Sequence, residues 1–267
     1  GGVEASIMDD SVHRNRLRAH DTGPRTGSCK IQTTATHDQK QTDSMLAELT
    51  RHHFSGSDMA IDHFDDAEQH ELWKFLEERV SPDADVEDVD RRIWEKFGVE
   101  GAIMFTDLSG FTRRSAELGI THFLAIIHQS QILLRPVIEK RDGTVFEVVG
   151  DSMLIWFPTI RQALHCSVEM QRACRQFNAD LKPANQILLC VGIGYGRVIR
   201  VGDSRLAGGE VNVASKLGED IAEGYEILIS DEACKAAGEM PGLTFTLTGT
   251  HLPGSPEVYR VTAPDAD

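Results

Sequence analysis

The stretch "VFEVVGDSMLIWF", Val145–Phe157, has the pattern of two short apolar strands joined by a two-residue turn. Glycine accepts the positive φ at the first position of a type II′ turn, so Gly150-Asp151 predicts a β-hairpin. Two carboxylates interrupt this apolar pattern. Period-two alternation predicts that Glu147 shares a strand face with Val145. Asp151 lies in the turn itself, where aspartate is also an ordinary turn residue without any further role.

Strands and helices surround this hairpin in the order βαββαβ. The apolar segment "AIMFTD" predicts a strand before it, and a helical region follows from "SGFT" through Lys140. After the hairpin, residues 160–179 predict a helix, and "QILLCVGIGYG" predicts a long strand that turns into "RVIRVGD". This order is that of the ferredoxin-like split unit. We therefore expect an α+β fold with a ferredoxin-like βαββαβ core.

Further elements extend this core. The predicted buried face of the first core helix consists of Phe123, Leu124, Ile127, Leu134 and Ile138. The C-terminal elements are helices around "EVNVASKLGEDIA" and "DEACKAAG" and strands around "YEILIS", "TFTLTG" and "EVYRV". We expect these strands to join the sheet.

The N-terminal part divides into two segments before the main domain, residues 99–267. Residues 1–60 are polar and lack a sustained period, which predicts a mostly disordered tail. Residues 61–98 predict two helices, of which the second carries the motif "VEDVDRRIWEKF". Its apolar stripe consists of Val86, Val89, Ile93 and Phe97. Such a stripe packs on its own domain or, alternatively, forms a dimer or transmits a signal.

The composition excludes several classes of function. The chain has a formal charge of −15, whereas nucleic-acid binding depends on Lys and Arg side chains that neutralise phosphates. No apolar run approaches the roughly 18 residues needed to span a membrane, and the N-terminus lacks the apolar region of a signal peptide. The five cysteines contain no C-x-x-C pair, which predicts reduced thiols. We expect a cytoplasmic protein with no nucleic-acid or membrane partner.

The segment "FTDLSGFT" places a further acid, Asp107, at the end of a predicted strand. In a βαββ unit this strand and the hairpin lie side by side, which brings Asp107 and Asp151 to one end of the sheet. Two facing carboxylates repel each other unless a cation lies between them. Mg²⁺ or Mn²⁺ with a nucleoside triphosphate fits, because these ions prefer oxygen ligands and share them with phosphates. Alone, Asp107 before Ser-Gly is also an ordinary helix N-cap.

A third motif, "GGEVNVASKLGED", predicts a helix on which Asn212 and Lys216 are four residues apart. They therefore lie on one helix face and can point at the same ligand. An amide and a charge on an exposed helix face need no function, so this segment alone leaves both interpretations open.

Together, "FTDLSGFT", "GTVFEVVGDSM" and "VNVASKL" resemble the catalytic domain of class III nucleotidyl cyclases, the adenylyl and guanylyl cyclases. The resemblance is close over residues 99–230 and looser in the rest of the C-terminal part. It implies that residues 99–267 form a cyclase catalytic domain. Its reaction would convert a nucleoside triphosphate into a 3′,5′-cyclic nucleotide and pyrophosphate.

The resemblance also implies a metal site. Asp107 and Asp151, helped by the backbone carbonyl of Leu108, would hold two divalent ions, Mg²⁺ or Mn²⁺. One ion would activate the ribose 3′-hydroxyl for attack on the α-phosphorus, and the other would neutralise the leaving pyrophosphate.

Other positions of the family pattern would contact the phosphates and the ribose. Gly110, Phe111 and Thr112 begin a helix, and their backbone N–H groups would cradle phosphate. Asn212 matches the family residue that contacts the ribose. Lys216 stands where the family usually has an arginine that stabilises the transferring phosphate. Lysine keeps the charge but loses the planar fork, which predicts slower activity.

The base-contacting positions indicate a preference among nucleotides. Glu147 matches a position that is typically lysine in adenylyl cyclases and glutamate in guanylyl cyclases. Its carboxylate can accept the N1–H and amino group of guanine, which favours GTP. The second base-contacting position falls at Arg205, where the loop departs from both family patterns. Adenylyl or pyrimidine (UTP or CTP) cyclase activity is the alternative.

The family builds its sites between two domains, and this chain contains one. The resemblance therefore implies a homodimer in which Asp107 and Asp151 of one subunit face Glu147, Asn212 and Lys216 of the other. A non-catalytic dimerisation or ligand-sensing module is an alternative, motivated by Lys216 and the unusual loop. A diguanylate cyclase is disfavoured because the central hairpin lacks a Gly-Gly-Asp/Glu turn.

Overall fold

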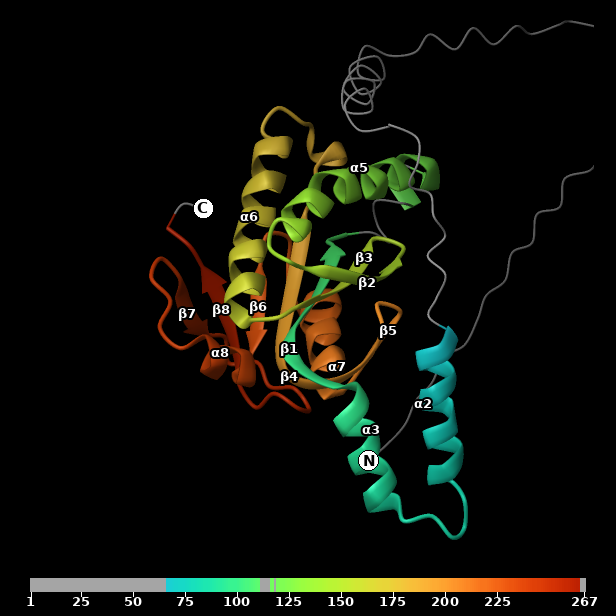
Figure 1. Ribbon diagram of the computed structural model, residues 1–267. Helices are drawn as coiled ribbons and strands as arrows, with labels where there is room; N and C mark the ends of the chain where they lie inside the picture. Colours follow the sequence, from blue (N-terminus) through green and yellow to red (C-terminus); the bar gives the residue numbers. More distant parts are fainter. Residues whose placement is uncertain (1–65, 111–115, 118, 265–267) are drawn as a thin grey trace, which may run out of the picture. The chain divides into compact units, whose positions relative to one another are not determined.

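The computed structural model describes residues 66–110, 116–117 and 119–264. Their strands form one mixed sheet in the order β2-β3-β1-β4-β6-β8-β7, and β5 pairs with β4 (Figure 1). The strands are β1 (Gly98–Leu108), β2 (Thr144–Val149), β3 (Ser152–Phe157), β4 (Leu189–Val201), β5 (Arg205–Ala207), β6 (Ile227–Ser230), β7 (Thr244–Leu247) and β8 (Val258–Thr262).

The first half of the sheet has the predicted ferredoxin-like order. Strands β3 and β4 both pair antiparallel with β1, and the chain runs β1, α5, β2, β3, α6, β4. Strand β6 is parallel to β4, and β8 and β7 complete that edge. The predicted α+β fold class is confirmed. The helices are α2 (Asp66–Arg79), α3 (Val86–Phe97), α5 (Ile120–Glu139), α6 (Ile160–Asn178), α7 (Gly209–Ser215) and α8 (Asp231–Ala237), with a 3₁₀ turn at Pro183–Asn185 and a π-helical turn at Lys216–Ile221.

Both faces of the sheet are covered. On β1, Ala102 and Met104 belong to the main core, which also contains residues of α5 and α6. Ile103 points to the opposite face and packs with Ala214 of α7. Successive side chains of a strand point to opposite faces, so β1 contributes to both cores. Figure 1 shows α7 on the other side of the sheet from α5 and α6.

The β2–β3 hairpin has the predicted turn. Val149 pairs with Ser152, so Gly150 and Asp151 form a two-residue connection. Gly150 has a φ of 59°, whereas Asp151 has no positive φ. Positive φ at the first position alone is the feature of a type II′ turn.

The prediction that Glu147 shares a strand face with Val145 is wrong. The pairing of β2 with β3 shifts register between Val145 and Glu147, which makes Phe146 a β-bulge. Val145 and Val148 pack against the main core, whereas Phe146 packs on the opposite face. The extra residue inverts the alternation after it, so Glu147 does not share a face with Val145.

Two predicted core residues are exposed. Leu124 is 54% exposed because it lies beside Ile120, four residues earlier, on a stripe adjacent to the buried one. Val86 is 41% exposed because it is the first residue of α3, one turn before the buried Val89. The expected turn within the long strand is also absent, since β4 continues without interruption from residue 189 to residue 201.

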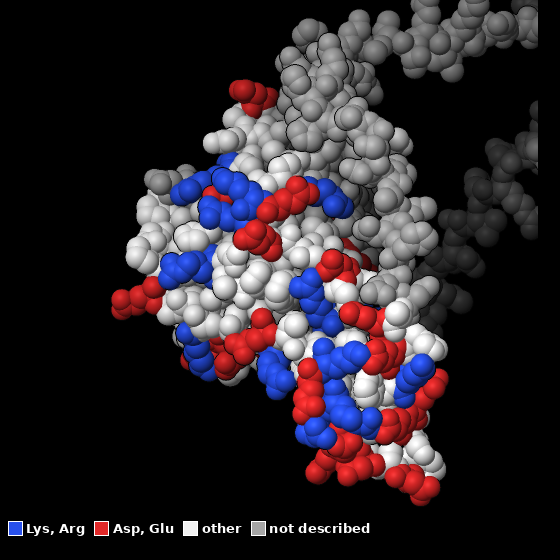
Figure 2. Space-filling model, in the orientation of Figure 1, with Lys and Arg blue, Asp and Glu red and all other residues white. Residues whose placement is uncertain are grey.

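Helices α2 and α3 form an N-terminal helical hairpin. Leu72 of α2 shares a small core with Val201 of β4 and with the buried residues of α3, which are Val89, Ile93 and Phe97. The stripe of α3 therefore packs on its own domain. Figure 2 shows side chains of both charges crowded over this hairpin. Its exposed ion pairs include Arg79–Asp90 at 2.6 Å and Arg91–Glu95 at 2.8 Å, and such pairs contribute little to stability.

Within the described residues, no helix combines the length and the apolar character needed to cross a membrane. The cysteines of this part are free, and burial raises the pKa of Cys166, Cys174 and Cys190 to about 12. Thiols with such a high pKa are protonated and unreactive near neutral pH. Cys29 and the predicted tail, residues 1–60, lie outside the described residues.

Candidate functional site

A hollow of ≈ 980 Å³ opens where β1 ends beside the β2–β3 turn. It is termed the acidic hollow, because the carboxylates of Asp107, Asp151 and Glu219 line it. Its walls come from the end of β1, the hairpin turn and the helical turn after α7. Three segments that are far apart in the sequence therefore meet at one end of the sheet.

Strand pairing brings the two predicted acids to this hollow. Thr106 of β1 pairs with Met153 of β3, so the next residue of β1, Asp107, lies beside the turn that contains Asp151. The hydroxyl of Ser152 donates a hydrogen bond of 3.0 Å to Oδ1 of Asp107. Asp107 and Asp151 therefore lie together at one end of the sheet.

Burial and neighbouring acidic charges raise the pKa values of both acids. Burial, followed by the charge of Asp151, raises the pKa of Asp107 to about 6, while the hydrogen bond from Ser152 acts in the opposite direction. Burial also raises the pKa of Asp151, and the charge of Glu219 adds to this effect. The ionised pair is therefore costly in the protein alone and would be stabilised by a nearby cation.

The donor atoms fit a hard divalent cation. Oδ2 of Asp151 is buried and has no hydrogen-bond partner within the described part of the chain. Carboxylate oxygens are the ligands that Mg²⁺ and Mn²⁺ prefer, and these ions commonly complete their coordination with water and substrate phosphates. Among the described residues, no group of three or more His, Cys, Asp or Glu side chains could hold a metal ion. The arrangement fits an ion that a phosphate-bearing substrate helps to hold.

Ser215 and Glu219 line the acidic hollow although the sequence motifs assigned them no role. Ser215 directly precedes the π-helical turn Lys216–Ile221, and Glu219 lies on this turn. The turn packs directly on the sheet. A Cβ at Gly218 would lie 2.6 Å from the carbonyl oxygen of Phe105, so only glycine permits this approach. Glycine inside a predicted helix was the available signal for the close contact.

The other residues predicted at this site differ in how far the structure describes them. Leu108 and Gly110 line the acidic hollow, and Gly110 has a φ of 82°. Phe111 and Thr112 lie outside the described residues. The predicted phosphate cradle is therefore described only at its first residue.

A second hollow, of ≈ 550 Å³, lies between β2 and β5 and is termed the β2–β5 hollow. Glu147 of β2 and Arg205 of β5 both line it, together with the bulged residue Phe146. The structure therefore brings together the two residues that were predicted to contact a base. Counting along the sequence alone did not fix Arg205 in this position, because the loop before α7 departs from the family pattern.

Asn212 and Lys216 line neither of the two hollows. Asn212 is on α7, Lys216 begins the following turn, and both are exposed. Neither Asn212 nor Lys216 is among the described residues that line the two hollows. The ammonium of Lys216 forms an ion pair of 3.2 Å with Asp220. Within one chain, the predicted site residues thus fall into three separate groups.

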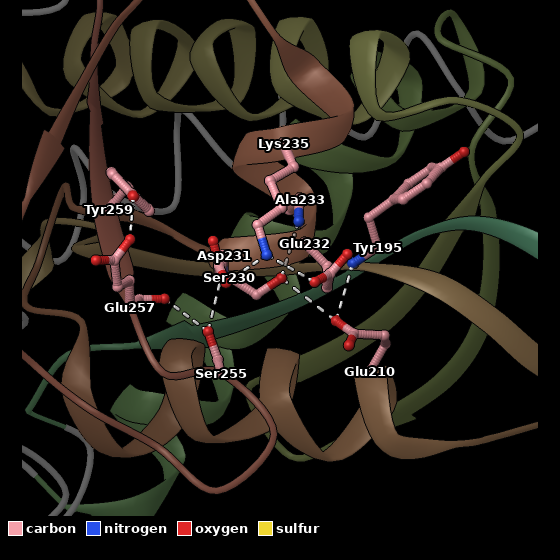
Figure 3. Close-up of polar contacts among 10 residues, drawn as sticks. All are labelled: Tyr195, Glu210, Ser230, Asp231, Glu232, Ala233, Lys235, Ser255, Glu257 and Tyr259. Carbon is pink, nitrogen blue, oxygen red and sulfur yellow. Dashed lines mark hydrogen bonds and ion pairs between the residues drawn. The ribbon is translucent and has the colours of Figure 1, made fainter.

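A polar network fixes the helix that carries Asn212 (Figure 3). Oε2 of Glu210, in the first turn of α7, accepts the N–H of Tyr195 at 3.0 Å and the hydroxyl of Ser230 at 3.3 Å. Ser230 also accepts the N–H of Ala233 and so caps α8. Burial raises the pKa of Glu210. These contacts hold α7 against β4 and β6 and so define where Asn212 is presented.

Comparison with known proteins places these features in context. A family model described as "Adenylate and Guanylate cyclase catalytic domain" matches residues 99–255. This range contains every predicted site residue and both hollows. Helices α2 and α3 precede it.

Individual relatives agree with this match. A protein of Rhizobium meliloti (strain 1021) named "Putative adenylate cyclase 3" is 30% identical over 151 residues, which are 56% of this chain and 25% of that protein. The chain thus spans a quarter of the length of this curated relative. The solved structure of an adenylate/guanylate cyclase/hydrolase from Silicibacter pomeroyi is 27% identical with a TM-score of 0.54, covering 63% of this chain and 98% of the other. The guanylyl cyclase Cya2 is 25% identical with a TM-score of 0.51, covering 62% and 93%.

Proposed function

Because the chain belongs to the family of adenylate and guanylate cyclase catalytic domains, we propose that it is a metal-dependent class III nucleotidyl cyclase. It converts a nucleoside triphosphate into a 3′,5′-cyclic nucleotide and pyrophosphate. The observation that carries this proposal is the pair of acids in one hollow, with a buried, unpartnered oxygen on Asp151. A non-catalytic module has no use for two partly buried acids that repel each other.

Asp107, Asp151 and the backbone carbonyl of Leu108 are the residues that would hold two divalent ions, Mg²⁺ or Mn²⁺. When bound, such ions lower the pKa of the ribose 3′-hydroxyl and offset the charge of the leaving pyrophosphate. Asp107 and Asp151 hold the ions as ionised carboxylates. Their raised pKa values favour the protonated acids, so each bound proton must leave before an ion binds. The backbone N–H groups of Gly110 and the two residues after it receive phosphate oxygens.

The active unit is a homodimer with composite sites. Asn212 and Lys216 are exposed and do not line the acidic hollow of their own chain, which supports a role in the hollow of a second copy. There, the amide of Asn212 orients the ribose. Lys216 exchanges its ion pair with Asp220 for the charge on the transferring phosphate. A two-fold axis would give two equal sites.

The β2–β5 hollow receives the base, and GTP is the favoured substrate. The carboxylate of Glu147 accepts the N1–H and amino group of guanine, while the guanidinium of Arg205 can donate to guanine O6 and N7. Adenine presents an acceptor at N1 and a donor at N6, which mismatches both side chains. ATP, UTP and CTP are the alternative substrates.

Replacing Glu147 by lysine tests this base assignment. Glu147→Lys is expected to lower the ratio of kcat/KM for GTP over ATP by about tenfold or more, because each pair of matched hydrogen bonds to a base contributes about 1–3 kcal/mol of discrimination. Steady-state rates with both nucleotides measure the ratio. Glu139→Lys, which makes the same charge change at an exposed position on α5, should leave it unchanged. An unaltered ratio in an active Glu147→Lys protein would contradict the assignment.

The raised pKa of Asp107 predicts a pH dependence of metal binding. Because its folded pKa of about 6 lies above the ordinary value, the metal-free protein loses stability as pH rises toward 6 and the pair becomes ionised. Metal binding has the opposite dependence, since the ion competes with the proton. The apparent affinity for Mn²⁺ should fall about tenfold per pH unit below pH 6 and level off above 7.

Titrations of Mn²⁺ followed by electron paramagnetic resonance between pH 5 and 7.5 would measure this affinity. Ser152→Ala removes the hydrogen bond that favours the ionised form of Asp107, so its profile should move to higher pH. A flat profile in both proteins would mean that Asp107 does not take part in binding the ion.

The proposed reaction itself is tested by its products. Purified protein is incubated with each of ATP, GTP, CTP and UTP plus Mn²⁺, and the products are identified by mass. A 3′,5′-cyclic nucleotide, formed fastest from GTP, is expected. If no cyclic product forms from any of the four under conditions where the protein is dimeric, the cyclase proposal fails and a ligand-sensing module is favoured.

A further inference from the structure

Helices α2 and α3 lie outside the range that the cyclase family model matches, yet they pack on β4, the strand that leads into β5 and so into one wall of the β2–β5 hollow. The small core of Leu72, Phe97 and Val201 joins both helices to the last residue of β4. Strand β5 begins four residues later, at Arg205. The N-terminal helical hairpin is therefore in contact with the turn that leads into one wall of the hollow.

Helix α2 holds this turn through a partly buried polar contact. Oε2 of Glu68 accepts the backbone N–H of Gly202 at 2.8 Å, and Gly202 has a φ of 53°, which favours glycine. Nε of Arg200 donates to the carbonyl oxygen of Gly202 at 3.0 Å. Arg200 also forms an ion pair with Asp203. Both sides of the β4–β5 turn are thus fixed, one of them from α2.

The same helix contacts Arg205 directly. The guanidinium carbon of Arg205 lies 5.8 Å from the centre of the Trp73 ring, within the range of a cation–π interaction. Trp73 is 48% exposed, so core packing does not account for its ring. Within the described part of the chain, the ring of Trp73 makes its cation–π contact with Arg205, which lines the β2–β5 hollow.

A second link runs from the β4–β5 turn to the opposite wall of the hollow. The guanidinium of Arg200 lies 4.5 Å from the ring centre of Trp156 and 5.2 Å from that of Phe146. Phe146 is the bulged residue next to Glu147, and both line the hollow. The turn that α2 holds therefore supports the wall with Glu147 as well as the wall with Arg205.

We propose that Trp73 and Glu68 of α2 are positioning residues for base recognition. Trp73 restrains the guanidinium of Arg205, and Glu68 restrains the turn before it, so that Arg205 faces Glu147 across the β2–β5 hollow. Neither residue touches the nucleotide. This inference rests on the proposed function, because it assigns the hollow to the base.

The test measures nucleotide selectivity in the full chain. Trp73→Ala should lower the ratio of kcat/KM for GTP over ATP roughly two- to fivefold, the size expected for a cation–π contact near the surface. Trp73→Phe, which keeps an aromatic face, should retain most of the ratio. Trp94→Ala is a matched control, since Trp94 lies on α3 of the same helical hairpin and its ring centre is 4.9 Å from the guanidinium of Arg197 on β4, and neither residue lines the hollow. Melting temperatures check that every variant is folded.

A double-mutant cycle separates positioning from a general structural role. If Trp73 acts through Arg205, Trp73→Ala should have no further effect on selectivity in an Arg205→Ala background. An unchanged ratio in folded Trp73→Ala protein would overturn the inference. An effect of equal size with and without Arg205, or an equal effect of Trp94→Ala, would also overturn it. If the wild-type chain forms no cyclic product from any nucleotide, the proposed function fails, and this inference fails with it.

Discussion

Asp151→Asn is expected to lower kcat by about 10³-fold or more, corresponding to about 4 kcal/mol of transition-state stabilisation. The amide preserves the size of the side chain but removes the charge that would hold a divalent ion. Oδ2 of Asp151 is buried without a partner, so this atom has no structural hydrogen bond to lose. The rate of cyclic nucleotide formation at saturating Mn²⁺ and GTP measures the effect.

The same substitution should make the metal-free protein more stable, not less. Burial and neighbouring acidic charges raise the pKa values of Asp107 and Asp151, so removing one charge relieves their repulsion above pH 6. A higher melting temperature with a large loss of activity would separate a functional role from a structural one. Asp180→Asn, at an exposed position after α6, controls for loss of a negative charge and should change neither quantity. Near-normal activity of Asp151→Asn would exclude Asp151 as a metal ligand.

Mixing two inactive variants is expected to restore activity. In a dimer of an Asp151→Asn chain with a Lys216→Ala chain, one site combines Asp151 and Lys216 from different subunits and is intact. Random pairing makes half of the dimers mixed, each with one of two sites intact, so about a quarter of wild-type activity should return. Lys216→Ala alone should lose about 10²- to 10³-fold in rate, as expected for a group that stabilises the transition state.

The control for this experiment pairs two variants of the same half-site. A mixture of Asp107→Asn and Asp151→Asn chains leaves every composite site without one acid, and it should stay inactive. Subunit exchange is followed by native mass spectrometry of tagged chains. If mixed dimers of Asp151→Asn with Lys216→Ala form but show no more activity than either parent, the site is not shared between subunits.

The sequence was sufficient to predict features that depend on local chemistry. The Gly150-Asp151 pair has one residue that tolerates positive φ, and the alternating apolar pattern on either side leaves a hairpin as the simplest structure. The position of Asp107 at the end of an apolar strand followed in the same way. Because the order βαββαβ has a known arrangement of strands, these local predictions also placed the two acids at one end of the sheet.

Features that depend on tertiary packing could not be predicted in the same way. The bulge at Phe146 moves Glu147 to the opposite face of the strand, and no residue type in that segment indicates a bulge. Leu124 is as apolar as its buried neighbours, and only the position of α5 over the sheet decides that it is exposed. Glu219 reaches the acidic hollow because a π-helical turn packs against β1, a contact made possible by Gly218.

Arg205 shows what the structure adds to the predicted site. Its loop gave no secure alignment, and its proximity to Glu147 is a consequence of the pairing of β5 with β4. That pairing also brings Arg205 under Trp73, a residue outside the cyclase domain match. Helix α2 thereby becomes part of the account of base recognition, although nothing in its sequence indicates a nucleotide.

The central claim is that Asp107 and Asp151 hold the divalent ions on which cyclisation depends. Its most direct test is a titration of Mn²⁺ into the wild-type protein with 3′-deoxy-GTP, which lacks the attacking hydroxyl, followed by electron paramagnetic resonance. The account predicts about two bound ions per subunit, with that binding lost in Asp107→Asn and Asp151→Asn proteins. Equal Mn²⁺ binding by the wild type and both variants would contradict it.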